Sequence, residues 1–422
     1  MFKKNFLLST IIIFVFIYFS LEYKLFSFYV PPIKDSFGNI VKFGDWTIIV
    51  DLAKCFKLGI DVFDNNKCDV SGRPHVYGTV LLYLPYVLTF YDFYIHIIPP
   101  IIIFFLIFIV NIFYSPKSFF DYMLLLCIIF STPFILAIER LNIEVIIFFF
   151  LILLALSINS KIQKFIILIL SSIKFYPVTL GLFFLKKGIS VKLLIKNILF
   201  LIIILICFFL DKEQILNVFN KRNSINPSTV DNVGMLIFSF YGIPELIKST
   251  LIHLKFFELK NDEISNLFYN ISLITMSMLV LINSFELLLK KRSILDKHEL
   301  ILNFKYFQDK LFLFSIISIL TIYFMTMSYV YKEIYFFGLI PLLKKKIEMK
   351  KNVLSRRIFY LILIKFILLS FLWLVQIFFF PTSVYIKGFN ILVKNLIDFY
   401  IILILLKIFL LFLFRSLKIK FS

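Results

Sequence analysis

Long apolar runs, separated by short clusters of charge, follow one another along almost the whole chain. An α-helix needs about 18 or more mostly apolar residues to cross a bilayer. The runs lie at roughly 6–28, 97–114, 120–138, 142–157, 193–210, 264–289, 310–330, 334–343, 357–380 and 390–414. Together with interrupted segments between them, the pattern predicts an all-α, polytopic transmembrane bundle of about 10–12 helices.

One further apolar segment, 164–185, carries Lys174 and Pro177 in its middle, within KFIILILSSIKFYPVTLGLFFL. Basic residues flank this segment on both sides, at Lys161, Lys164, Lys186 and Lys187. A straight span would place one of these basic pairs outside the cell. We therefore predict a broken helix, or a hairpin of two half-helices, with Lys174 facing a cavity.

The segment Val76–Ile98 is also apolar, but polar and helix-breaking residues interrupt it at Gly78, Pro85, Asp92 and His96. If it were counted as a span, every later loop would change sides and the sorting of charges would invert. Its tyrosines suit the depth of the membrane interface. The pattern predicts an interfacial or partly inserted helix on the exterior face, following an amphipathic first exterior loop.

Charge supports one orientation of these spans. The 422 residues are 61% hydrophobic and carry a net charge of +20. With the N-terminus in the cytoplasm, the clusters predicted to be cytoplasmic are mostly basic, and they include Lys3/Lys4, Lys117, residues 290–292, residues 344–346 and Arg415. The exterior segment 31–75 is balanced, with six basic and six acidic residues, and the exterior segment 211–263 is near neutral. We expect a multi-pass plasma-membrane protein whose first helix is an uncleaved signal anchor.

The excess of positive charge is explained by this topology, so it does not indicate a nucleic-acid partner. Cys55 and Cys68 share the first exterior loop, where a disulfide and two free thiols are both open alternatives. The sequence contains no CxxC, HExxH or carboxylate cluster with metal-ligand spacing, and no glycine-rich phosphate loop. We therefore expect no protein-built metal site and no cofactor, although a divalent ion on a substrate phosphate stays open.

Charged residues beside or inside apolar runs are costly in a bilayer, and they are the candidate functional residues. Four groups stand out: Asp45, the ERLNIE motif with Glu139, Arg140 and Asn142, Lys174, and the pair Lys332 and Glu333. Each group also has a purely structural explanation. Asp45 would cap a helix, and Glu139 and Arg140 would form an ion pair in a loop. Lys174 would be a snorkelling side chain, and Lys332 would anchor the chain at the membrane interface. In the predicted topology all four groups fall on the exterior face, which favours a functional site there.

The order and spacing of these motifs resemble the glycosyltransferase C superfamily, and most of all the polyprenol-phosphate-mannose-dependent α-mannosyltransferases of glycosyltransferase family 87. The resemblance covers residues 1–345, with gaps. It rests on these matches: Asp45 with Ala53, Gly59, Val62 and Phe63; Tyr77 and Pro85; ERLNIEVIIFF; Lys174, Tyr176 and Pro177; and Tyr329, Tyr331, Lys332, Ile334, Phe336 and Pro341.

The chain departs from the family pattern at two places. Gly78 and Thr79 replace two prolines, and Leu141 replaces a glycine. No matched residue carries the preference for mannose. The resemblance implies a catalytic module at 1–345, which leaves 346–422 as a C-terminal transmembrane hairpin.

The resemblance implies transfer of a sugar from a polyprenyl-phosphate donor to a glycan or glycolipid acceptor on the exterior face, with inversion and a single base. Such chemistry needs a carboxylate to take the proton of the acceptor hydroxyl, a role that suits Asp45. It also needs cations on the leaving phosphate, which suits Arg140, Lys174 and Lys332. The remaining polar residues of these motifs are expected to contact substrate: Glu139, Asn142, Tyr77 and Tyr331.

Two other functions stay open. A transporter or flippase for a lipid-linked glycan would use the intramembrane cations without a base, and a glycan polymerase or ligase would be an enzyme of another kind. Two acidic neighbours of Asp45 are expected to be structural, namely Asp51 and Asp61. Replacing Asp45 distinguishes a transporter or flippase from a glycosyltransferase. A transporter would keep its activity, because it needs no general base.

Overall fold

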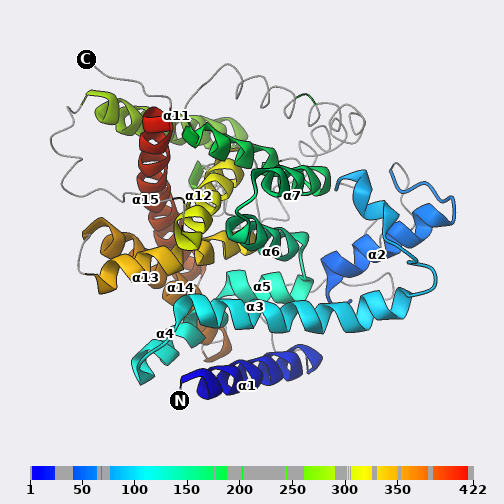
Figure 1. Ribbon diagram of the computed structural model, residues 1–422. Helices are drawn as coiled ribbons and strands as arrows, with labels where there is room; N and C mark the ends of the chain where they lie inside the picture. The colour runs from blue at the N-terminus through cyan, green and yellow to red at the C-terminus, as the bar shows by residue number, and fades with distance from the viewer. Residues whose placement is uncertain are drawn as a thin grey trace. The chain divides into compact units, whose positions relative to one another are not determined.

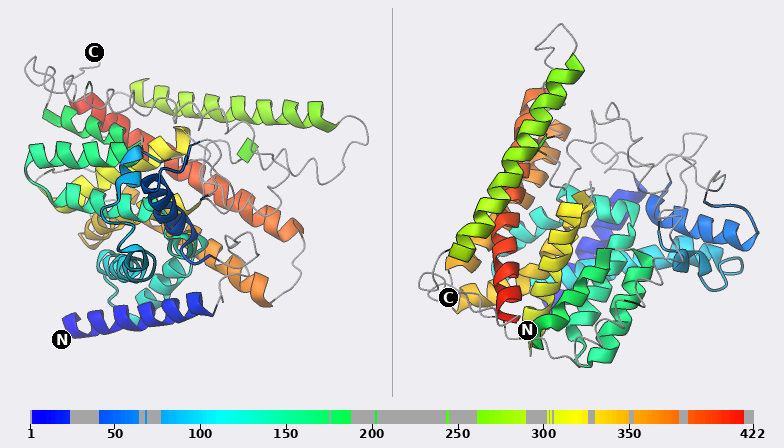
Figure 2. Two further views of the ribbon diagram at one scale, coloured as in Figure 1. Left: turned by 90° about the vertical axis from the view of Figure 1, so that its right-hand side faces the viewer. Right: turned by 90° about the horizontal axis from the view of Figure 1, so that it is seen from above.

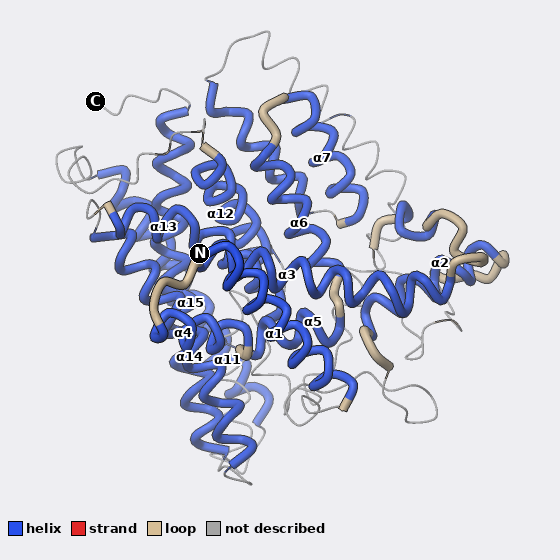
Figure 3. The backbone as a smooth tube through the Cα atoms, turned by 60° about the horizontal axis from the view of Figure 1, so that its bottom comes forward, coloured by secondary structure: helices blue, strands red, loops and turns tan. Residues whose placement is uncertain are grey.

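The computed structural model describes residues 2–23, 41–63, 68, 77–174, 176–187, 202, 243–244, 261–289, 302, 304, 306–325, 330–349, 353–378 and 384–416. All the regular elements in these ranges are helices, as Figure 3 shows. The predicted all-α class is confirmed for this part of the chain. The predicted span 193–210 and the exterior segment 211–263 lie outside the described residues, apart from residues 202, 243–244 and 261–263.

Four helical segments are long and apolar enough to cross a membrane: Phe93–Tyr114, Leu267–Ser284, Phe307–Phe324 and Leu392–Phe414. A fifth candidate is a bent pair, Phe119–Ile129 and Thr132–Arg140, whose axes differ by 53°. Two further apolar helices are shorter than a full span. The described residues thus hold four or five candidate spans, consistent with a helical membrane protein and fewer than the number predicted from apolar runs.

The chain divides into two compact units. The first comprises residues 1–181 and 190–225, and the second comprises residues 182–189 and 226–422. The boundary expected at residue 345 stays a prediction.

In the first unit, α1 (Phe2–Glu22) lies along α3 (Ile98–Tyr114), as Figure 1 shows. The two apolar helices share one buried polar contact, in which Asn111 Nδ2 donates to Thr10 Oγ1 at 2.9 Å and to Ser9 Oγ at 3.0 Å. A buried amide needs such partners, so this contact fixes the register between the helices. The helix α1 ends at Glu22, before the end of the predicted span 6–28.

The predicted span 120–138 is two helices, α4 (Phe119–Ile129) and α5 (Thr132–Arg140). The break falls at Ser131, and Pro133 then occupies the first turn of α5, where a missing N–H costs nothing. The Ser131 hydroxyl donates back to the carbonyl of Ile128 at 2.6 Å. The predicted span 120–138 is therefore a bent pair of helices, which is the fifth candidate span.

The next two helices are α6 (Ile143–Leu156) and α7 (Ser160–Ile173), which pack against each other. The chain then becomes extended at Lys174, with φ −143° and ψ 149°, and continues as the 3₁₀ helix η4 (Tyr176–Lys187). Lys174, the C-cap of α7, has an extended backbone, so the α-helix ends there. The predicted break in 164–185 is present.

The segment Val76–Ile98 is not one helix, so that prediction was wrong. It contains a short 3₁₀ helix, η2 (Thr79–Tyr83), then turns, then a π-helical stretch, η3 (Phe93–Ile97), which runs directly into α3. Pro85 removes a backbone donor, and Tyr86 has a positive φ of 51°. These two residues prevent a regular helix, and the membrane-length segment begins at Phe93 instead.

The second unit contains α11 (Asn261–Leu289), α12 (Phe307–Met325), the 3₁₀ helix η7 (Val330–Leu339), α13 (Ile340–Glu348), α14 (Val353–Phe378) and α15 (Val384–Ser416). Figure 2 shows α11, in yellow-green, running along α15, in red. The helices α14 and α15 also pack together, and η7 packs on α12. The predicted span 334–343 is divided between η7 and α13, because Pro341 starts a new helix.

Candidate active site

The carboxylate of Asp45 lies at the start of α2 (Gly44–Lys57), in the first turn of the helix. The residue before the helix, Phe43, has a left-handed backbone with φ 51°, which turns the chain sharply into α2. Asp45 is only 7% exposed, and its Oδ2 accepts a hydrogen bond from Asn142 Nδ2 at 2.5 Å. A negative charge is favoured at a helix N-terminus, so α2 stabilises the Asp45 carboxylate while Asn142 orients it.

The partner of Asp45 is itself held in place. Asn142 is the N-cap of α6, and its Oδ1 accepts the backbone N–H of Glu144 at 3.1 Å. The side-chain amide is therefore fixed at both ends, with the oxygen on the helix and the nitrogen on Asp45. A tight turn joins α5 to α6 through Leu141, which is fully buried and has a left-handed φ of 42°.

Behind Asn142 lies a buried ion pair that connects α6 to the break after α7. Glu144 is 0% exposed, and its Oε1 is 2.6 Å from Lys174 Nζ. Its other oxygen, Oε2, accepts a hydrogen bond from the Tyr176 hydroxyl. Both donors come from the short stretch where α7 ends, so the break supplies the two groups that neutralise Glu144.

The loop before η2 reaches the same place. Lys174 Nζ lies 5.2 Å from the centre of the Tyr77 ring, which is a cation–π distance. The next residue, Gly78, donates its backbone N–H to the carbonyl of Ile173 at 2.9 Å. A Cβ at Gly78 would collide with the backbone of Ser172, so a glycine is required for this approach.

The last turn of α5 brings Glu139 and Arg140 to this region. These two residues end α5, and α5 packs against α2, the helix that carries Asp45. Glu139 Oε2 is buried and has no hydrogen-bond partner within the described ranges. Direct contacts in the first unit thus join Asp45 to Asn142 and Lys174 to Tyr77, and Glu144 connects the two pairs.

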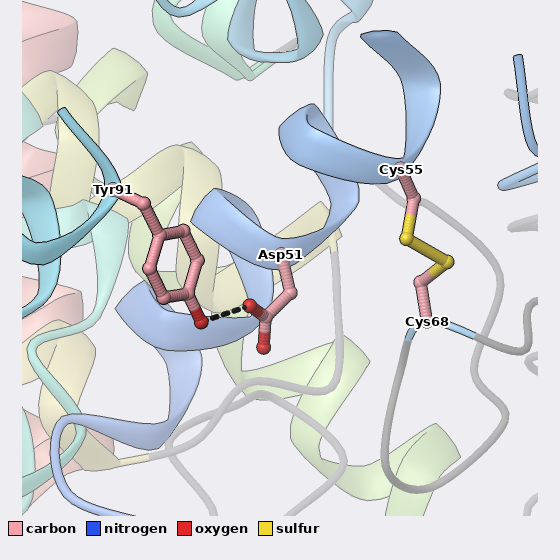
Figure 4. Close-up of a disulfide and its surroundings, with 4 residues drawn as sticks. All are labelled: Asp51, Cys55, Cys68 and Tyr91. Carbon is pink, nitrogen blue, oxygen red and sulfur yellow. Dashed lines mark hydrogen bonds between the residues drawn. A yellow bond between two sulfur atoms is a disulfide. The ribbon is translucent and has the colours of Figure 1, made fainter. Parts of the chain in front are cut away.

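Other residues of α2 make a different set of contacts. Tyr91 OH donates to Asp51 Oδ1 at 2.6 Å (Figure 4), and Lys54 Nζ lies 4.2 Å from the centre of the Tyr91 ring. Burial, and then the hydrogen bond to Asp51, raise the pKa of Tyr91 far above its usual value, so the phenol stays protonated as the donor. Trp46 Nε1 also donates to the carbonyl of Tyr94 at 2.9 Å. The hydrogen bond from Tyr91 gives Asp51 a structural role.

A disulfide joins Cys55 at the end of α2 to Cys68, as Figure 4 shows. Of the two alternatives left open by the sequence, the structure contains the bridge. It packs beside a small core formed by Ile48, Leu52, Val62 and Leu82. In the same loop Asp61 Oδ1 accepts the backbone N–H of Phe63 at 2.8 Å, which is a local turn contact.

Two predicted site residues belong to the second unit. Lys332 and Tyr331 lie in η7, where Lys332 is partly exposed and the side chain of Tyr331 is outside the described part of the structure. The structure thus assigns the predicted residues to two separate groups, one around Asp45 and one on η7.

The second unit also buries a group of four charged side chains that the sequence patterns largely did not reveal. We call it the four-charge cluster: Glu333, Lys365, Lys394 and Asp398. Lys365 Nζ is 2.8 Å from Glu333 Oε2 and 2.5 Å from Asp398 Oδ1. Lys394 Nζ is 2.8 Å from Glu333 Oε1 and 2.7 Å from Asp398 Oδ2. All four side chains are at most 2% exposed.

Sequence reasoning named Glu333 but gave roles neither to Glu144 nor to the other members of the four-charge cluster. A signal for them exists in the sequence. Lys365 interrupts the apolar run LILIKFILL, and Lys394 and Asp398 are four residues apart, the spacing of a helical ion pair. Glu144 follows Asn142 by two residues at the head of an apolar run.

No protein-family model, curated protein or solved structure matches this chain. Within the described ranges, no group of three or more histidine, cysteine or acidic residues is placed to hold a metal ion. We therefore infer function from the geometry around Asp45.

Proposed function

We propose that this chain is a membrane glycosyltransferase that moves a sugar from a polyprenyl-phosphate donor to a glycan or lipid acceptor, with inversion. The observation that carries the proposal is the oriented carboxylate of Asp45. It is buried, sits at a helix N-terminus, and is held from one side by Asn142 at 2.5 Å.

Such a carboxylate fits the role of general base. The acceptor hydroxyl loses its proton as it attacks the anomeric carbon, and a positioned carboxylate takes that proton. The bond from the anomeric carbon to the donor phosphate breaks, and polyprenyl phosphate leaves with the electron pair. Asn142 contacts only one of the two carboxylate oxygens, which leaves the other available to an acceptor.

Cations must stabilise the phosphate as its negative charge grows. Arg140 lies beside the Asp45 region and offers the planar, bidentate geometry that suits phosphate. Lys332, which the sequence also predicts as a phosphate ligand, lies on η7 of the second unit, and its role stays a prediction. Lys174 pairs with Glu144, which neutralises its charge, so we do not keep it as a phosphate ligand. We assign Lys174 to support of the α6 N-terminus, and through it to Asn142.

An exterior location for this site is part of the proposal. The Cys55–Cys68 disulfide supports it, since disulfides persist in oxidising compartments and are rare in the cytosol. The sorting of basic clusters to the opposite side agrees with it. The lipid tail of the donor would stay in the bilayer while its phosphosugar reaches Asp45.

The test compares the protein with its Asp45→Asn variant in lipid nanodiscs supplied with a panel of polyprenyl-phosphate sugars and an acceptor extract. Release of polyprenyl phosphate should fall about a hundredfold or more in the variant. The matched control is Asp51→Asn, on the same helix, which should keep most of the activity because Asp51 contacts Tyr91 instead.

The outcomes separate the open functions. Equal release by the protein and by Asp45→Asn would remove Asp45 as the base. No release with any donor would contradict the transferase proposal and favour the transporter or flippase, which requires the cations and no base. Release with one sugar alone would identify the donor.

A further inference from the structure

One carboxylate of the first unit lacks the partner that buried charges normally have. The Oε2 atom of Glu139 is buried and accepts no hydrogen bond in the part of the chain that the structure describes. By contrast, the buried carboxylate of Glu144 is paired with Lys174 at 2.6 Å. A buried polar atom without a partner is costly, and native proteins keep few of them. Glu139 is therefore a candidate for a contact that a bound substrate supplies.

A closed turn connects Glu139 to the contact that holds the proposed base. The backbone N–H of Asn142 donates to the carbonyl of Ala137 at 3.3 Å, across the left-handed Leu141. Such a bond is typical of the Schellman motif, which closes the end of a helix. It fixes Glu139, in the last turn of α5, relative to Asn142, whose amide donates to Asp45 Oδ2 at 2.5 Å. Glu139 thus has a fixed place beside this contact.

The chemistry of a carboxylate narrows the choice of ligand. An ionised carboxylate only accepts hydrogen bonds, so its ligand is a hydrogen-bond donor or a cation. The phosphate of the proposed donor carries negative charge and would be repelled, and the lipid tail is apolar. Among the described residues, no group of three or more histidine, cysteine or acidic side chains is placed to hold a metal ion. The sugar hydroxyls are the remaining groups of the substrates, and Glu139 is partly exposed, so a sugar can approach it.

We propose that Glu139 determines sugar specificity, with its carboxylate accepting a hydrogen bond from a hydroxyl group of the donor sugar or the acceptor sugar beside Asp45. This inference rests on the proposed function, because it takes a sugar as the ligand. A site that binds a hydroxyl group in this way discriminates strongly against a sugar that lacks it, since a buried polar group is then left without its partner. Glu139 would select the sugar, while Asp45 takes the proton.

The experiment measures kcat/KM for release of polyprenyl phosphate by the full chain in nanodiscs. The substrates are the donor that the unchanged protein uses in the panel described above, and the monodeoxy analogues of that donor. Glu139→Gln keeps the size of the side chain and removes its charge. With the complete donor, the variant should lower kcat/KM about tenfold or more, the loss expected for a hydrogen bond to a charged group.

The analogues show which substrate carries the hydroxyl group. If it belongs to the donor, one monodeoxy analogue should react equally slowly with the unchanged protein and with Glu139→Gln, because both changes remove the same hydrogen bond. If it belongs to the acceptor, the loss should persist with every donor analogue, and the KM for the acceptor extract should rise about tenfold.

Thermal unfolding in detergent separates substrate binding from a structural role. Glu139→Gln should not lower Tm, because the Oε2 atom has no hydrogen-bond partner to lose among the described residues. The matched control is Glu144→Gln, which changes another glutamate of the first unit. It should lower Tm, since it removes one member of a buried ion pair.

The results distinguish this inference from the proposed function. If the unchanged protein releases polyprenyl phosphate from no donor, the proposed function is overturned, and the role of Glu139 with it. If the unchanged protein is active and Glu139→Gln matches it in kcat/KM and in the KM for acceptor, only the role of Glu139 is overturned. That role is overturned as well if Glu139→Gln lowers Tm as much as Glu144→Gln, or if its loss is equal for every donor analogue while the KM for acceptor stays the same.

Discussion

Asn142 contacts the Asp45 carboxylate with one end of its amide and caps α6 with the other. One residue thus links the start of α2 to the start of α6, across 97 positions of sequence. Asp45 is held in a fixed direction rather than merely exposed on a loop. Substitutions at Asn142 should therefore change the behaviour of the base itself.

Asn142→Asp keeps the helix cap, because a carboxylate oxygen still accepts the N–H of Glu144. It also places a second carboxylate against Asp45, and two carboxylates at this separation share a proton. We expect transfer at pH 7 to fall at least tenfold and to recover as the pH rises, measured as a pH–rate profile.

The control for this change is Asn159→Asp. Asn159 caps α7 in the same way, with its Oδ1 accepting the N–H of Lys161 at 2.9 Å. It should leave the pH profile unchanged. A parallel shift in both variants would mean that added negative charge, not contact with Asp45, causes the effect.

The ion pair of Glu144 and Lys174 allows a test of the structural role assigned to Lys174, which is to support the N-terminus of α6. Lys174→Met removes the cation paired with the buried Glu144 carboxylate, while the Tyr176 hydroxyl still donates to it. We expect the free energy of unfolding in detergent to fall by about 3 kcal/mol, at the low end for a buried pair because Lys174 is partly exposed. Chemical denaturation measures this loss.

Adding Glu144→Gln to Lys174→Met should recover most of that stability, since the pair is then replaced by neutral groups. If Lys174 instead binds the donor phosphate directly, its loss should raise the KM for donor while stability stays near the original. That combination of results would return Lys174 to the set of phosphate ligands.

At the scale of elements, the site depends on irregular backbone between helices. The break at Lys174, the left-handed Leu141 and the close approach at Gly78 each aim a side chain that a continuous helix would direct elsewhere. Helix ends and turns are thus the elements that form this site. The backbone geometry of these helix ends and turns depends on tertiary packing, which cannot be predicted from the lengths of apolar runs.

Gly78→Ala tests the approach of the loop to α7. The added methyl group would meet the backbone of Ser172, which has no flexible end to move aside. We expect a loss of more than about 4 kcal/mol in unfolding free energy, or no folded protein in detergent. Thermal unfolding followed by circular dichroism measures the change.

The comparison variant is Gly59→Ala. Gly59 has a positive φ of 76°, but a methyl group there meets nothing within 4 Å. Its cost is backbone strain alone, about 1 kcal/mol. Equal losses at the two glycines would show that conformation, and not collision with Ser172, limits position 78.

For the whole molecule, the helical class follows directly from apolar run length, because a spanning helix needs that length. The broken segment at Lys174 was also predictable, since charge and proline inside an apolar run mark a break. Run length did not show that 120–138 is bent or that 334–343 spans two elements. Those breaks depend on single residues, such as Ser131 and Pro341.

The candidate site was predicted only in part. Asp45, Asn142, Lys174 and Tyr77 were named, and the structure connects them. Their connection runs through Glu144, which no spacing rule selects, because its partners lie 30 and 32 residues away. The left-handed backbone of Leu141 could not be read from the sequence either, because leucine rarely adopts a positive φ.

The predicted orientation has its own test. In a chain with Cys127 and Cys207 replaced by serine, Tyr86→Cys should react with a membrane-impermeant maleimide in intact cells. Glu348→Cys, beside the basic residues 344–346, should react only after the cells are permeabilised. Both positions are exposed, so access of the reagent depends on the side of the membrane. The opposite pattern would reverse the topology and place Asp45 in the cytoplasm.

The sequence order of the four residues of the four-charge cluster affects how the protein inserts into the membrane during synthesis. Glu333 leaves the ribosome first and Lys365 follows on α14, so the first negative charge meets its counterion when the next long helix arrives. Lys394 and Asp398 then enter together on α15, one helical turn apart and already paired. At no stage of insertion does the growing bundle hold more than one uncompensated charge from this cluster.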